Sequence, residues 1–171
     1  MEKVKGVNQR GTATKDRVEP ASEPDGRTAL IEDVLAMRPR VMAVLRVMEK
    51  LQRHPLLDEA RNQLALAEYH LNRTLLELDV PEDERKFSPT AVERGRIKLV
   101  EVRHSHEKFG QVARHADSLR QMVREIMIQL HLSAEMAWIY GELSNTYDCC
   151  GRAAFWIEQA AAFYRQKSVG G

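Results

Sequence analysis

The sequence has only two cysteines in 171 residues, Cys149 and Cys150, and they are adjacent. Neighbouring residues on a helix point about 100° apart, so a disulfide between these two would be strained. Two thiols with no partners elsewhere cannot build a disulfide framework or a structural zinc site either. We therefore expect one buried and one half-exposed free thiol, and a reducing compartment, cytoplasmic or nuclear.

Glycine and proline are also scarce, with nine and six residues, whereas helix-forming residues are abundant. No apolar run approaches the roughly 18 residues of a membrane-spanning helix, and residues 1–20 lack the hydrophobic segment of a secretory signal. The net charge of +1 creates no overall field that would select nucleic acid or a membrane as partner. These absences predict a helical globular protein that does not bind membranes.

The chain divides into a tail and one domain. Residues 1–26 mix charged and small polar residues without a period, which predicts a disordered tail. Residues 27–167 are expected to form a single helical domain, because a chain of this size can bury a core without a metal or a disulfide. Within it, residues 27–80 carry two heptad seams typical of packed helices. The seam residues are Val34, Met37, Val41, Val44, Met48 and Leu51, then Leu57, Ala60, Leu64, Ala67, Leu71, Thr74 and Leu78.

The short break at His54-Pro55 predicts that the two seams belong to an antiparallel helical hairpin. The leucine heptad also resembles a dimeric zipper. We favour the hairpin, since a matching seam lies only a few residues away in the same chain. Pro39 lies inside the first seam and should either kink the helix or mark the boundary between a short helix and the main one.

A charged loop, 80–87, separates this hairpin from a predicted long helix over residues 88–131. Ser88 suits the N-cap and Pro89 the first helical position. The helix carries a further heptad seam, and Gly95 and Gly110 weaken it without requiring a break. The seam residues are Val102, Phe109, Val112, Ala116, Leu119, Val123, Ile126 and Leu130.

Residues 133–167 are predicted to form a C-terminal hairpin, with Ser133 as N-cap and a turn at Gly151. Residues 137–164 resemble one helix pair of the tetratricopeptide family. The family's aromatic, leucine, small and tyrosine positions are matched by Tyr140, Leu143, Ser144 and Tyr147, and positions of its second helix by Ala153, Ile157 and Ala160. No repeat near 34 residues occurs upstream, so we interpret the segment as ordinary antiparallel packing. Its dense aromatic residues indicate either core or a partner surface.

Charge patterning supplies the main alternative function. Residues 94–124 hold eight Lys or Arg and three acids, an excess that could contact phosphates. Residues 56–85 hold eight acids and three Arg. We expect the two excesses to lie against each other within the bundle, which disfavours nucleic-acid binding. If they do not, Arg94, Arg96 and Lys98 are the first residues to test.

Two more specific hypotheses, a metal site and a nuclease site, have less support from the sequence. Glu101 and His104 have the Glu-x-x-His spacing of di-iron bundles, but such sites need the motif twice with two further glutamates, and His115 does not complete one. Arg124 and His131 fit the loose Arg…His spacing of the HEPN helical nucleases, without the polar run that usually accompanies it. We assign no catalytic, cofactor-binding or metal residues and expect no cofactor.

The sequence therefore predicts an all-α antiparallel bundle of about five helices, partly coiled-coil in character. The expected function is that of a non-catalytic protein-protein interaction or scaffold subunit, with an unidentified protein partner and self-association left open. The alternative is a nucleic-acid-associated protein using residues 94–124, and a HEPN-like ribonuclease comes third.

Overall fold

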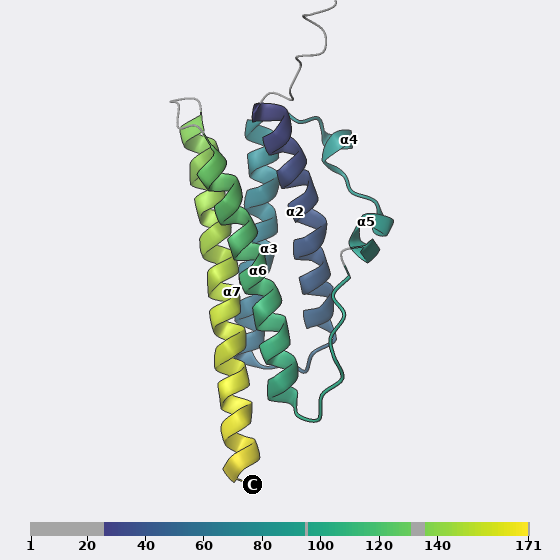
Figure 1. Cartoon of the computed structure of the whole chain (residues 1–171), viewed down its shortest axis with the longest axis vertical. Helices are drawn as coiled ribbons and strands as arrows, with labels where there is room; N and C mark the ends of the chain where they lie inside the picture. The colour runs from purple at the N-terminus through teal and green to yellow at the C-terminus, as the bar shows by residue number, and fades with distance from the viewer. Residues whose placement is uncertain (1–25, 95, 131–135, 171) are drawn as a thin grey trace, which may run out of the picture.

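A computed structural model describes residues 26–94, 96–130 and 136–170, and all regular structure in these ranges is helical (Figure 1). Five of the helices pack against one another and the sixth, α4, is a single turn. The all-helical prediction is confirmed, whereas residues 1–25 of the predicted tail, and Ser133, lie outside the described residues. The helices are α2 (Gly26–Glu49), α3 (Pro55–Glu77), α4 (Glu82–Arg85), α5 (Pro89–Arg94), α6 (Ser105–Gln129) and α7 (Ala137–Gly170).

The four long helices form a square bundle in which neighbours run antiparallel (Figure 1). α2 packs on α3, α3 on α7, α7 on α6, and α6 on α2. Consequently α3 and α6 stand at opposite corners and point the same way, as do α2 and α7. None of the described helices is long and apolar enough to cross a membrane.

The predicted hairpin of α2 and α3 is confirmed, and every residue of its two seams is buried. The His54 ring caps α3 by accepting a hydrogen bond from the Leu56 N–H at 3.1 Å. The Arg61 guanidinium of α3 donates to the Met48 carbonyl at the end of α2, which also accepts from the Leu51 N–H. α2 continues through the buried Pro39, so of the two alternatives expected there, a kink or a helix boundary, the boundary is wrong.

The prediction of one long helix over residues 88–131 is wrong for the middle part of that range. α5 begins at Pro89 as expected, with the Ser88 hydroxyl accepting from the Ala91 N–H, but residues 96–104 are not helical. Because α3 and α6 point the same way, the chain between them must travel back along the whole bundle (Figure 1). Extended backbone covers about 3.3 Å per residue against 1.5 Å in a helix, so a short extended segment can make this return.

The extended segment, residues 96–104, is attached to the bundle by hydrogen bonds between its backbone and a side chain of α6. The Gln111 side chain of α6 donates to the Val100 carbonyl at 3.0 Å and accepts from the Val100 N–H at 2.8 Å. Ile97 and Leu99 pack against the core on alternate residues, as in a strand. Val102, where the predicted seam begins, is 37% exposed, whereas the seam from Phe109 to Ile126 is buried in α6.

The predicted C-terminal hairpin 133–167 is also wrong, because α7 is one continuous helix that passes through Gly151. Its buried positions keep a helical spacing on both sides of that residue, so no turn is needed to bury them. The tetratricopeptide resemblance fails for the same reason. Gly151 instead permits close packing, since a Cβ there would lie 3.1 Å from the Arg120 Cδ of α6.

We expect Gly141→Ala to raise the free energy of unfolding by about 0.5–1 kcal/mol, because alanine stabilises a helix interior relative to glycine. Nothing lies within 4 Å of the position of its Cβ. Gly151→Ala should gain clearly less, since Arg120 has to move. Urea unfolding followed by circular dichroism measures both variants. Equal gains would show that Arg120 yields at no cost.

Candidate interaction site

The residues with metal-ligand spacing do not form a metal site. Glu101 lies in the extended segment and His104 is the N-cap of α6, so the two side chains do not project from one helix face. The His104 ring stacks on His106 with centroids 5.4 Å apart, and Glu107 accepts from the His104 N–H. Among the described residues, no three His, Cys, Asp or Glu side chains are grouped to hold a metal.

Both cysteines are buried, which corrects the expectation of one half-exposed thiol. The continuous α7 turns two adjacent positions into the core, because α7 packs against both α3 and α6. Burial raises the pKa of the Cys150 thiol to about 12, and burial also raises the pKa of Cys149. A thiol that stays protonated near neutral pH is a poor nucleophile.

Arg124, half of the predicted nuclease pair, is exposed and lines a groove of about 360 Å³ between the end of α6 and the start of α7. The groove also contains Tyr140, Tyr147 and Ile128. His131 lies outside the described residues. The described part of this groove therefore offers aromatic and aliphatic surface with one cation, and no described acid–base pair.

Two polar clusters hold elements together. The Arg38 guanidinium of α2 donates to Glu68 of α3 at 2.7 Å, binds the Arg85 carbonyl and lies 5.1 Å from the centre of the Phe87 ring. His70 of α3 contacts Glu142 of α7, with Nδ1 and Oε2 2.7 Å apart. Each of these side chains pairs with a group on another element, so both clusters hold elements of the fold together.

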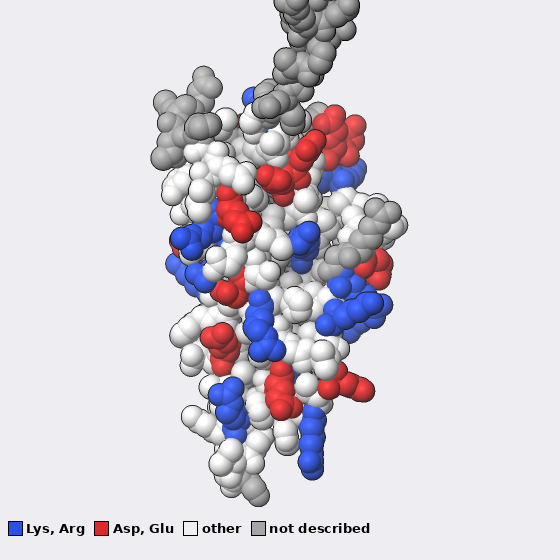
Figure 2. Space-filling model, in the orientation of Figure 1, with Lys and Arg blue, Asp and Glu red and all other residues white. Residues whose placement is uncertain are grey.

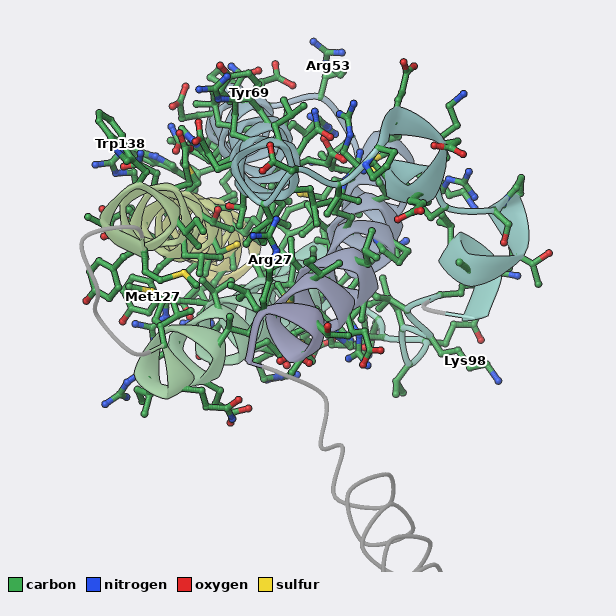
Figure 3. All side chains as sticks on the ribbon, turned by 90° about the horizontal axis from the view of Figure 1, so that it is seen from above. Arg27, Arg53, Tyr69, Lys98, Met127 and Trp138 are labelled. Atoms are coloured by element: carbon green, nitrogen blue, oxygen red, sulfur yellow. The ribbon has the colours of Figure 1, made fainter. Side chains whose placement is uncertain are left out.

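The expected compensation between the acids of residues 56–85 and the bases of residues 94–124 is wrong. α3 and α6 occupy opposite corners, and the acids of α3 pair elsewhere: Asp58 with Arg61, and Glu68 with Arg38. On one face, acidic and basic side chains are interspersed, and basic ones gather beside α5 (Figure 2). Lys98 points away from the bundle at its periphery (Figure 3).

The least expected feature is an apolar row on the outer face of α3. Leu66, Tyr69 and Leu76 are 45%, 54% and 40% exposed. They are spaced by three and seven residues, so they share one side of the helix, opposite the seam that faces the core. Their periodicity is visible in the sequence, but the stronger leucine seam of the same helix hides it.

Trp138 of α7 is a further exposed aromatic side chain near this row. Its side chain is 76% exposed, and in the view along the bundle it lies on the same side of the molecule as Tyr69 (Figure 3). Trp138 precedes Glu142 by one helical turn, and Glu142 contacts His70. Because α3 and α7 are antiparallel, Trp138 lies near the end of α3 that carries Leu76. We call Leu66, Tyr69, Leu76 and Trp138 the α3–α7 outer face.

Comparisons of the chain with protein-family models, with curated proteins and with solved structures found no match.

Proposed function

We propose that this protein is a non-catalytic interaction or scaffold subunit that binds a protein partner through the α3–α7 outer face. The observation that carries the proposal is the exposure of Trp138 and Tyr69 beside an aligned pair of leucines. Single exposed apolar residues are common on protein surfaces. An aligned apolar row that includes one aromatic side chain and has a second one nearby is typical of partner surfaces.

The chemistry of this face suits a protein partner. Tryptophan and tyrosine bury large areas on association at low cost in side-chain entropy, and they dominate the energetics of many interfaces. One ionic group lies within the row: Arg73, between Tyr69 and Leu76, contacts Glu77 at 3.4 Å and Glu142 at 3.8 Å. Arginine is enriched with aromatic residues in protein interfaces, so its presence in the row is compatible with a partner surface.

The test is affinity purification from native cells with three forms of the full chain. Wild type should retain a specific protein, and Tyr69→Glu should lose it because a charge is placed in the apolar row. Phe155→Glu is the matched control: Phe155 is 51% exposed on α7, about 25 Å along the helix axis from Trp138. Equal retention by all three forms would contradict the proposal.

One observation favours a second candidate, nucleic-acid binding. The bases of residues 96–124 are not covered by α3, and Arg46, Lys50 and Arg96 line a shallow groove of about 200 Å³ beside α5. Glu93 lies in the same groove, with its carboxylate 3.8 Å from the Arg46 guanidinium, and reduces the local positive charge.

This second candidate is tested by titrating a nonspecific oligonucleotide at several salt concentrations. True nonspecific binding has a dissociation constant of about 10⁻⁴–10⁻⁶ M at physiological salt, and its logarithm depends steeply on log salt. The variant Arg96→Ala/Lys98→Ala should then weaken binding and reduce the slope by about two. Binding no stronger than about millimolar, without a salt slope, would exclude this candidate.

A further inference from the structure

The outer face of α3 carries four residues whose spacing is the same in both chain directions. Leu66, Tyr69, Arg73 and Leu76 follow one another at spacings of three, four and three residues. All four lie on the side of α3 opposite its buried seam, and the Arg73 side chain is 42% exposed. The spacing is symmetric about residue 71, so reversing the helix about that point places Leu66 on Leu76 and Tyr69 on Arg73.

We propose that a second copy of this chain covers the α3–α7 outer face, with the two α3 helices antiparallel. The two-fold axis crosses the outer side of α3 at the level of residue 71, opposite the buried Leu71 side chain. This inference rests on the proposed function and names the partner. A two-fold interface requires a self-complementary surface, in which residue i meets residue j and residue j meets residue i. The α3 row satisfies that requirement at each of its four positions.

The pairing that results is chemically matched. Leu66 lies opposite Leu76 of the partner subunit, and the symmetric contact repeats at the other end. Tyr69 lies opposite Arg73 of the partner subunit, where a guanidinium over an aromatic ring gives a favourable cation–π contact. Arg73 already contacts Glu77 and Glu142 of its own copy, so its charge is balanced as the interface excludes water.

The positions next to the row do not oppose this pairing. In the same register Ala65 lies opposite Glu77 of the partner subunit, so no like charges meet directly across the pair. Trp138 lies on α7 one helical turn from Glu142, level with the end of α3 that carries Leu76, and Leu66 of the partner subunit approaches that same end. Each end of the helix pair therefore gains one tryptophan, and the face described as exposed becomes a continuous two-fold interface.

The register is tested by disulfide cross-linking of the full chain. Leu66→Cys and Leu76→Cys are prepared as separate variants and oxidised by air with copper-phenanthroline, alone and mixed in equal amounts. The mixture should give a covalent dimer on a non-reducing gel. Either variant alone should not, because identical positions would lie about 15 Å apart along the antiparallel pair, beyond disulfide reach. Wild type is the blank, since both native cysteines are buried.

Cross-linking of either single variant as efficiently as the mixture would overturn the antiparallel register. Self-association itself is measured by sedimentation velocity over a range of concentrations. Wild type should dimerise, Tyr69→Glu should raise the dissociation constant at least tenfold, and Phe155→Glu should leave it unchanged. A wild type that stays monomeric to about 100 μM overturns the dimer. If Tyr69→Glu nevertheless loses a cellular partner, the proposed function survives and only the identity of the partner is wrong.

Discussion

Leu64→Ala is expected to lower the free energy of unfolding by about 2–5 kcal/mol, as measured by urea unfolding. Leu64 lies in the middle of the α3 seam and is fully buried in the core shared by the four long helices. Alanine removes the buried aliphatic atoms and leaves a cavity that the surrounding helices cannot fill completely. This is the largest effect that we expect from a single aliphatic truncation.

Ile128→Ala is the matched control, since Ile128 is 71% exposed on α6 and its truncation should cost under about 0.5 kcal/mol. A loss of less than half a kcal/mol for Leu64→Ala as well would contradict the buried seam. It would instead indicate that the leucine heptad of α3 faces solvent in the monomer, as in a zipper.

The second large effect is expected at Arg38. Arg38→Ala should lower the free energy of unfolding by about 2–3 kcal/mol, because it leaves the poorly exposed Glu68 carboxylate without its partner. It also removes the hydrogen bond to the Arg85 carbonyl and the contact with Phe87, which together attach the connection after α3 to the bundle. Chemical denaturation gives the size of the loss.

Arg38→Lys separates charge from geometry. Lysine keeps the positive charge but cannot bind a carboxylate and a carbonyl with a planar fork while stacking on an aromatic ring. We expect it to recover less than half of the loss. Full recovery would mean that charge alone accounts for the contribution of Arg38. Proteolysis near Phe87 should increase in both variants if the connection is released.

The local pattern of the sequence predicted most of the helices and their buried faces. Heptad spacing identified the core residues of α2 and α3, and those of α6 from Phe109 onward, because a buried face has to repeat with the helical period. Ser88 and Pro89 marked the start of α5 for an equally local reason. The candidate site was not predicted, since the weaker row of Leu66, Tyr69 and Leu76 shares its helix with the leucine seam.

The errors share one cause. Gly95 was expected to lie within a continuous helix and Gly151 to form a turn, yet α5 ends at Arg94 and α7 continues through Gly151. Glycine costs a helix about 1 kcal/mol, which tertiary packing readily outweighs. At Gly151 the close approach of Arg120 uses the missing side chain, whereas after α5 the chain has to return along the bundle.

By itself the sequence determined that the chain is helical and which side of α2, α3 and most of α6 is buried. Periodicity depends only on a residue's own helix, so it reports burial without identifying the neighbour. Only the tertiary structure decided that α3 lies diagonal to α6, that the acids and bases do not compensate each other, and that Trp138 of α7 lies on the same side of the molecule as Tyr69. Those outcomes depend on which helices meet, and contacts between residues far apart in the chain set them.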